Sequence, residues 1–315
     1  MFSAAELEAA ARIVYAAMPP TPQYAWPLLA RRAGCEVWVK HENHTPTGAF
    51  KVRGGLVYFD RHRPRGGVIS ATRGNHGQSV AFAGRRAGIA VSIVVPRGNS
   101  AEKNAAMRAF GAEVIEHGRD FDEARPEAER LARERGLEMV PSFHRDLTLG
   151  VATYALELLR AVPALDTVYV PIGMGSGICG LIRTRDLLGL KTRIVGVQSE
   201  RAPSYALSFA AGRVVTTESA DTFADGMATR VPDPQAFEII RSGAERIVTV
   251  SEDEIAGAMR ALFTDTHNVA EGAGAAPLAA LLKEQGAMRG RKAGVILSGG
   301  NIDLSLFCRV MAGES

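Results

Sequence analysis

Residues 45–53 read TPTGAFKVR, and this stretch decides how the rest of the sequence is interpreted. Lys51 follows a Pro-Thr-Gly turn and an aromatic residue, and it stands at the start of an apolar helical pattern. Burial at such a point lowers the pKa of an amine and makes it a usable nucleophile or imine partner. The alternative is a structural lysine that reaches solvent from the start of a helix.

Strand and helix patterns alternate through most of the remaining sequence. Apolar strands are predicted at residues 37–40, 67–70, 91–95, 113–116, 138–141, 167–172, 193–198, 247–250 and 294–297. Amphipathic helices are predicted between them, and residues 203–233 are predicted to be irregular. Continuous apolar strands that alternate with helices are typical of parallel sheets covered on both faces, so the predicted fold class is α/β.

The totals exclude several classes of protein. A chain of 315 residues fits about two domains, and its 46% hydrophobic and 23% charged residues are those of a globular protein. The net charge is +3, and its arginines alternate with acidic residues, so we expect no nucleic-acid partner. No apolar run could span a bilayer and the acidic start is no signal peptide, so we expect no membrane partner. Three cysteines, an odd number without zinc-site spacing, suit the cytoplasm.

The strongest local motif is the glycine loop at residues 171–178, which reads PIGMGSGI and follows a buried strand. Glycines let backbone N–H groups converge on an anion, and a helix start adds partial positive charge, so a phosphate site is predicted. Gly175, Gly177 and Gly180 also match the G-x-G-x-x-G pattern of nicotinamide-dependent oxidoreductases. A single match of this kind in mid-chain is weak, and this remains an alternative.

Three other loops also follow predicted strands or precede predicted helices. Residues 70–78 (SATRGNHGQ) suit a carboxylate or a ring hydroxyl, although Asn75 could simply cap a helix and His76 could be a packed core residue. Ser298, in residues 298–301 (SGGN), can pair with a ring nitrogen. Glu271 precedes a small-residue helix that we expect to be structural, and Glu271 itself could face the cleft. One lysine, a phosphate loop, a carboxylate loop and a ring-nitrogen hydroxyl together suit pyridoxal 5'-phosphate.

The sequence resembles the fold-type II pyridoxal-phosphate enzymes, and within them the serine/threonine dehydratase family, which includes threonine ammonia-lyases and serine racemases. The resemblance covers nearly the whole chain, and its motifs occur in the family's order, which makes it highly specific. These motifs are residues 48–53 (GAFKVR), 74–78 (GNHGQ), 173–177 (GMGSG), 224–226 (ADG), 271–275 (EGAGA) and 298–301 (SGGN).

The resemblance implies roles for individual residues. Lys51 resembles the Schiff-base lysine, and Phe50 resembles the residue that packs near the cofactor ring. Asn75 resembles the partner of the ring hydroxyl, and Ser298 resembles the partner of the ring nitrogen. The phosphate loop corresponds to Gly173, Met174, Gly175, Ser176 and Gly177. The loop that binds the substrate carboxylate corresponds to Thr72, Arg73, Asn75 and His76.

The implied activity is a lyase reaction on a small amino acid. Lys51 would abstract the α-proton of a 3-hydroxy amino acid, by default L-threonine or L-serine, and β-elimination would give a 2-oxo acid and ammonia. A bulkier or acidic substrate, such as phenylserine or hydroxyaspartate, is an alternative, as is another β-elimination or β-replacement reaction. A non-catalytic cofactor-binding protein is a further alternative.

The sequence departs from the family at several positions. Arg73 stands where serine racemases have a serine that acts as a base, and a guanidinium is a poor base, so racemisation is not expected. Arg73 could instead bind a carboxylate or shape the pocket. Met174 and Ser176 stand where many members have glycine. Gln198 and Ser204 stand where metal-dependent relatives have carboxylates, so no metal is expected there.

The resemblance also implies a domain organisation. Residues 1–65 and 146–315 would form a large cofactor-binding domain, and residues 66–145 a small mobile domain, with the cofactor in the cleft between them. Because enzymes of this fold are commonly dimers, a homodimer is expected.

Overall fold

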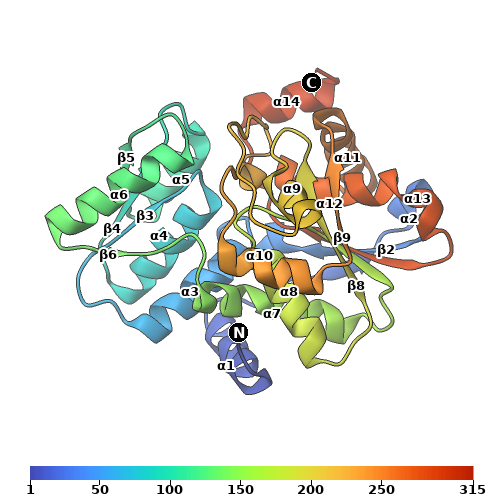
Figure 1. The fold of residues 1–315 in the computed structure, drawn as a ribbon, viewed down its shortest axis with the longest axis horizontal. Helices are drawn as coiled ribbons and strands as arrows, with labels where there is room; N and C mark the ends of the chain where they lie inside the picture. Colours follow the sequence, from blue (N-terminus) through green and yellow to red (C-terminus); the bar gives the residue numbers. More distant parts are fainter. Residues whose placement is uncertain (315) are drawn as a thin grey trace.

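The computed structural model describes residues 1–314 and has the α/β architecture that the sequence predicts (Figure 1). Its larger sheet has six strands in the order β1-β2-β10-β7-β8-β9. β1 pairs with β2 in the antiparallel direction, and all the other pairs are parallel. The bounds are β1 (Gln23–Ala25), β2 (Glu36–His41), β7 (Thr167–Pro171), β8 (Arg193–Ser199), β9 (Arg246–Val250) and β10 (Lys292–Leu297).

The smaller sheet has four parallel strands in the order β5-β4-β3-β6, and it lies on the left of Figure 1. Its strands are β3 (Val68–Ala71), β4 (Val91–Val95), β5 (Glu113–Glu116) and β6 (Glu138–Met139). All four come from one continuous part of the chain. The domain boundaries and the mobility of the small domain remain a prediction.

Helices cover both faces of the large sheet, as expected for parallel strands. Val168, Val170 and Ile194 pack with α7 (Arg145–Ala161) and α8 (Ser176–Leu187) on one face. The alternate residues Tyr169 and Val195 pack with α11 (Glu252–Thr266) and α12 (Gly272–Lys283) on the other. The larger helices are α1 (Ala4–Tyr15), α3 (Lys51–His62), α4 (Asn75–Ala87), α6 (Phe121–Arg135), α7 (Arg145–Ala161), α8 (Ser176–Leu187), α11 (Glu252–Thr266) and α12 (Gly272–Lys283). The shorter ones are α2 (Pro27–Ala33), α5 (Ala101–Ala109), α10 (Pro234–Gly243), α13 (Gln285–Met288) and α14 (Leu304–Ala312).

The prediction that residues 203–233 are irregular is wrong for the first part of that segment. Helix α9 spans Ser204–Ala211, and Gly212 ends it in the left-handed conformation with φ +66°. Apolar residues follow one another in this helix without a clear helical period, so the sequence pattern hides it. In the remainder, the structure has only the short 3₁₀ helix η2 (Asp225–Met227).

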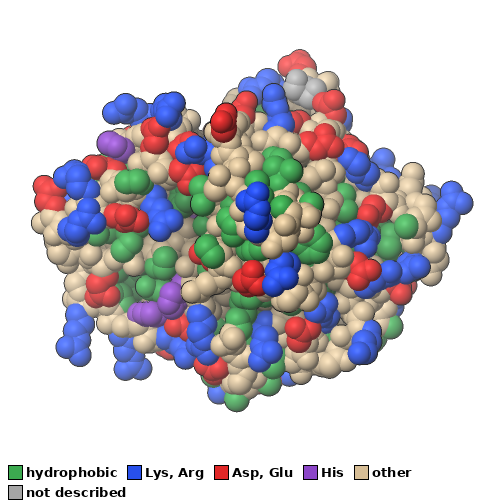
Figure 2. All heavy atoms as spheres, in the orientation of Figure 1, with side chains coloured by type: hydrophobic (Ala, Val, Ile, Leu, Met, Phe, Trp, Pro, Cys, Tyr) green, Lys and Arg blue, Asp and Glu red, His purple; other side chains and the backbone are tan. Residues whose placement is uncertain are grey.

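Charges of both signs are intermixed over the face shown in Figure 2. On α6, for example, Arg130 bonds to Glu127 and Glu134, one turn away on either side. Within residues 1–314, no helix combines the length and the apolar character that crossing a membrane requires.

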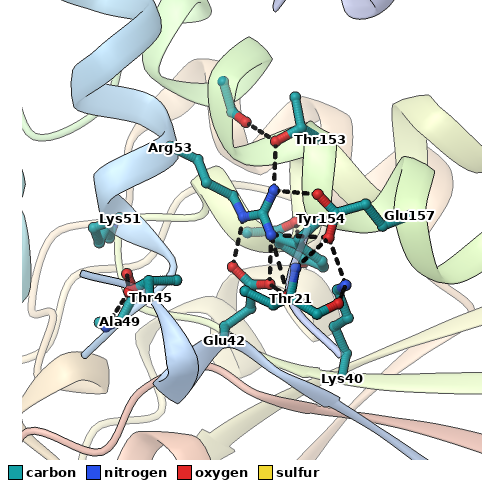
Figure 3. Close-up of polar contacts among 12 residues, drawn as sticks. Thr21, Lys40, Glu42, Thr45, Ala49, Lys51, Arg53, Thr153, Tyr154 and Glu157 are labelled. Carbon is teal, nitrogen blue, oxygen red and sulfur yellow. Dashed lines mark hydrogen bonds and ion pairs between the residues drawn. The ribbon is translucent and has the colours of Figure 1, made fainter. Parts of the chain in front are cut away.

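A buried ionic network fixes the start of α3 (Figure 3). The Arg53 guanidinium donates to Glu42 from Nε at 2.7 Å, and to Glu157 from Nη1 at 2.6 Å. It also donates to the hydroxyls of Thr153 and Thr21. Arg53 and Glu42 are completely buried, and the Glu157 side chain is 7% exposed. Charges so deeply buried persist only because each has a close partner.

The network joins four separate segments next to residues 45–51, which we call the Lys51 turn. Glu42 follows β2, Glu157 lies on α7, and Lys40 of β2 adds a second cation that bonds to Glu157 at 2.6 Å. Residues two positions apart on a helix point to nearly opposite faces, so Arg53 enters this network while Lys51 points away from it (Figure 3). The network therefore holds α3 in place without using the Lys51 side chain.

We predict that Arg53→Met lowers the free energy of unfolding by about 3–5 kcal/mol, because it leaves two buried carboxylates short of a cation. Urea titration of the apoprotein followed by circular dichroism measures this loss. Arg53→Lys keeps the charge without the planar fork and should fall between Met and the wild type. The control is Arg130→Met at an exposed position on α6, where a change within about 1 kcal/mol is expected. Equal losses in Arg53→Met and Arg130→Met would contradict the role of the network.

Candidate active site

The Lys51 turn is hydrogen-bonded to the loop that follows β10. The Phe50 N–H donates to the Ser298 carbonyl at 3.0 Å, and the Gly300 N–H donates to the Gly48 carbonyl at 2.9 Å. Gly48 has φ +66°, and a Cβ there would collide with the side chain of Asn301, so the turn requires glycine. Lys51 and Ser298, which are far apart in sequence, are thus held at one place by short backbone contacts.

Lys51 is the first residue of α3, and its amine lies against the glycine loop. Its Nζ donates to Ser176 Oγ at 3.0 Å and lies 5.1 Å from the centre of the Phe50 ring. The Lys51 carbonyl accepts a bond from Ser79 of α4 at 2.6 Å. Burial lowers the pKa of Lys51 to about 8, because the charged form loses hydration and has no carboxylate beside it.

The glycine loop presents free backbone donors at the start of α8. Among the described residues, no acceptor is found for the backbone N–H groups of residues 173–178. Gly175 is left-handed with φ +98°, and a Cβ on Gly173 would collide with the Gly226 carbonyl oxygen. Tyr154 donates to the Gly177 carbonyl at 2.9 Å and its ring meets Phe50 edge-on. The loop is therefore a fixed concave surface of N–H groups at the positive end of a helix.

The loop at residues 72–76 leads into α4. Helix α4 begins at Asn75 with Gly74 as its N-cap, so the alternative in which Asn75 caps the helix is wrong. Thr72 Oγ1 accepts from the Gly74 N–H at 3.0 Å, and the N–H groups of residues 75–77 find no acceptor within the described part of the chain. Burial lowers the pKa of His76 to about 3, helped by the nearby Lys51 charge, so His76 is neutral at physiological pH.

The side chain of Asn75 belongs to a polar cluster that the sequence did not reveal. Its amide donates to Glu271 Oε1 at 2.6 Å, and its carbonyl accepts from Asn301 at 2.9 Å. Lys103 of α5 donates to Asp225 at 2.6 Å and to Glu271 at 3.2 Å. Burial opposes the charge on Lys103, yet the two carboxylates raise its pKa. Burial raises the pKa of Glu271, against the attraction of Lys103.

All the side chains that the sequence singled out for the site line one pocket. These residues are Phe50, Lys51, Thr72, Arg73, Asn75, His76, Gly173, Met174, Gly175, Ser176, Gly177 and Ser298. The lining also includes Asp225 and Glu271, from the motifs at residues 224–226 and 271–275, and the structure adds Lys103. Lys103 lies on an ordinary amphipathic helix with no motif around it, so only the fold could have revealed its position.

Other residues singled out in the sequence lie outside this pocket. Gly180 packs against the backbone of Ala152 in α7, so it serves the contact between two helices. Gln198 accepts from the Ala206 N–H at 2.9 Å, and Ser204 donates to the Thr229 carbonyl at 2.7 Å. The absence of a metal ion at Gln198 and Ser204 stays a prediction.

Residues 14–299 match the model of a family described as pyridoxal-phosphate dependent enzyme. The chain belongs to this family. Its cofactor is therefore pyridoxal 5'-phosphate, and the fold prediction from the resemblance is confirmed. The nicotinamide alternative, which depended on Gly180 acting with Gly175 and Gly177, is wrong.

The chain is similar to several threonine-converting enzymes. It is 39% identical over 279 residues to L-threonine ammonia-lyase of Geobacter sulfurreducens, covering 87% of this chain and 69% of the relative. It is 35% identical over 302 residues to the catabolic L-threonine dehydratase TdcB of Escherichia coli (strain K12), covering 94% and 90%. The solved structure of threonine deaminase isoform 2 from Solanum lycopersicum, in its processed form, matches with a TM-score of 0.89 at 29% identity, covering 99% of this chain and 94% of that chain.

The lowered pKa of Lys51 predicts how apoprotein captures the cofactor at different pH values. Only the unprotonated amine is nucleophilic, so capture should reach half of its maximum near pH 8 and level off above about pH 9. A lysine with the ordinary pKa of about 10.4 would still gain reactivity between pH 9 and 10. Brief incubation with pyridoxal phosphate, borohydride trapping and mass spectrometry of the Lys51 peptide measure the rate. Continued gain above pH 9 would contradict the lowered pKa.

Proposed function

We propose that this chain is a pyridoxal-phosphate-dependent dehydratase that converts L-threonine or L-serine to a 2-oxo acid and ammonia. The observation that carries the proposal is the position of Lys51, whose low-pKa amine contacts the glycine loop in a chain similar to threonine ammonia-lyases. Water is lost across Cα and Cβ, and one water returns when the released enamine hydrolyses. No oxidant or reductant is needed.

The residues of the pocket suit this cofactor. The free N–H groups of residues 173–178 would hold its phosphate, and Lys51 Nζ would bind its aldehyde carbon. Asn75 would pair with the ring hydroxyl, and Phe50 would pack near the ring. The Ser298 hydroxyl, which makes no hydrogen bond to residues 1–314, would face the ring nitrogen.

Proton movement would depend on Lys51. When bound, the cofactor withdraws electrons from the substrate's Cα and so makes the α-proton acidic. The Lys51 amine would take that proton, and its lowered pKa keeps a useful fraction of the base unprotonated near neutral pH. His76 would be a much weaker base than Lys51, because burial lowers the pKa of its ring to about 3.

Ser298 would favour elimination over other outcomes. A hydroxyl can share a hydrogen bond with the ring nitrogen, but unlike a carboxylate it supplies no negative charge to keep that nitrogen protonated. Negative charge at Cα would then be delocalised less far, which favours rapid loss of the β-hydroxyl. Thr72 and the N–H groups of residues 75–77 would hold the substrate carboxylate at the start of α4.

We further propose that the protein is a cytoplasmic homodimer and that residues 66–145 form a small, mobile domain. We call the six-stranded sheet with its helices the large sheet unit, and the four-stranded sheet with its helices the small sheet unit. Large apolar side chains are exposed on the large sheet unit, among them Tyr24 of β1, Leu28 of α2 and Phe263 of α11. Helices α2 and α11 are joined by the ion pair of Arg32 and Asp265. The cysteines Cys35, Cys179 and Cys308 are free thiols, which suits a reducing compartment.

We predict that Lys51→Ala lowers ammonia release from L-threonine and L-serine by about 10³-fold or more, because the base is lost. Wild-type holoenzyme should be yellow, and borohydride should fix the cofactor mass on Lys51. The control is Lys191→Ala at an exposed position, which should keep wild-type activity. Lys51→Ala protein that folds normally and retains most of its activity would contradict the assigned role.

We predict that Gly173→Ala weakens cofactor binding by about tenfold, because its methyl group would force the loop away from Gly226. Titration of apoprotein with pyridoxal phosphate measures the dissociation constant. Gly286→Ala, on α13 with no atom near the added methyl group, is the matched control and should bind like the wild type. Equal affinity of both variants would argue against phosphate binding at this loop.

A further inference from the structure

Arg73 differs from every other charged side chain of the pocket because it has no partner. The charged residues in the lining are Lys51, Arg73, Lys103, Asp225 and Glu271. Lys103 is neutralised by Asp225 and Glu271, and Lys51 would be bound to the cofactor. Among residues 1–314, the Arg73 guanidinium makes no ion pair and no hydrogen bond, and its Nε is buried without an acceptor.

The unpaired Arg73 guanidinium requires a hydrogen-bond acceptor from outside the chain. A guanidinium stays charged at all relevant pH values, and its planar fork matches the two oxygens of a carboxylate. A buried N–H without a partner costs free energy, so such groups are nearly always satisfied in folded proteins. Arg73 is therefore suited to an anionic group of a bound ligand.

The other anions expected in the pocket already have donors. The N–H groups of residues 173–178 at α8 are available for the cofactor phosphate. Thr72 and the N–H groups of residues 75–77 at α4 are available for the α-carboxylate of an amino acid. Neither of these anions needs the Arg73 side chain. The remaining place for an anion is the substituent on the β-carbon of the substrate.

We propose, on the basis of the proposed dehydratase function, that the pocket takes a 3-hydroxy amino acid with a second carboxylate on its β-carbon, and that Arg73 binds this carboxylate. The substrate class is that of 3-hydroxyaspartate. The α-proton and the β-hydroxyl leave as water, and hydrolysis of the enamine with one water gives a four-carbon 2-oxo diacid and ammonia. The methyl group of threonine, in contrast, leaves Arg73 Nε without an acceptor.

The test compares the kcat/KM of the holoenzyme for the diastereomers of L-3-hydroxyaspartate with that for L-threonine. In Arg73→Gln the acid-to-threonine ratio of kcat/KM should fall about 10- to 100-fold, mainly through KM, because only the acid loses a charged hydrogen bond. Arg73→Lys keeps the charge without the fork and should lie in between. Arg119→Gln, which removes an exposed arginine on the surface, should keep the wild-type ratio.

Several outcomes would overturn the assignment. In Arg73→Gln, kcat/KM could fall by the same factor for hydroxyaspartate and for threonine. Arg73 would then bind the α-carboxylate or support the structure of the loop. Wild-type enzyme could consume threonine but neither diastereomer of the acid. Circular dichroism checks that Arg73→Gln is folded; if it is not, the Arg73→Lys ratio decides, and an unchanged ratio overturns the proposal.

A binding measurement separates this inference from the proposed function. Calorimetric titration of the holoenzyme with malonate and with acetate compares a dicarboxylate with a monocarboxylate. Malonate should bind more tightly to the wild type, and this advantage should disappear in Arg73→Gln. If no hydroxy amino acid is consumed, the proposed function fails, yet an Arg73-dependent malonate preference still supports the anion site. Malonate binding that is the same in both proteins overturns it.

Discussion

The guanidinium of Arg53, held between the carboxylates of Glu42 and Glu157, is the contact on which the arrangement of the site depends. It is buried where no water could replace a lost partner, so the segments that carry these charges have little freedom to shift. Because Arg53 is two residues from Lys51, the position of the amine follows from the position of the guanidinium. The chemistry on one side of α3 is thus fixed by an ionic contact on the other.

The two sheets contribute different parts of the pocket. The large sheet unit supplies Lys51, the free N–H groups of α8 and Ser298, which are the groups suited to the cofactor. The small sheet unit supplies the loop before α4, with Arg73, and Lys103 on α5. Lys103 reaches across to Asp225 and Glu271, so the two units meet through a buried ion cluster at the pocket itself. In the proposed roles both units contribute to the cofactor site, because Asn75 of the small sheet unit would pair with the ring hydroxyl, while the proposed substrate contact Arg73 comes from the small sheet unit.

Much of the fold could be predicted from sequence, because buried parallel strands and their loops leave local patterns. For example, Ser-x-x-Glu patterns form capping boxes at the starts of α1, with Ser3 and Glu6, and of α11, with Ser251 and Glu254. The loops at strand ends identify side chains that the structure gathers into one pocket.

Local patterns fail where a role depends on distant contacts. The bond of Asn75 to Glu271 joins residues 196 positions apart, and nothing near either residue predicts it. Helix α9 escapes prediction because its apolar residues have no period.

The place of β10 in the large sheet has a consequence for how the protein is made. This strand lies between β2 and β7, although it comes last in sequence among the strands of residues 1–314. The Lys51 turn is completed by residues near the C-terminus, and Asn301 bonds to the Thr47 carbonyl 254 positions earlier. During synthesis the facing edges of β2 and β7 therefore stay unpaired until β10 has been made. Unpaired strand edges promote aggregation, so the pairing of β10 removes two such edges at once and also completes the turn that holds Lys51.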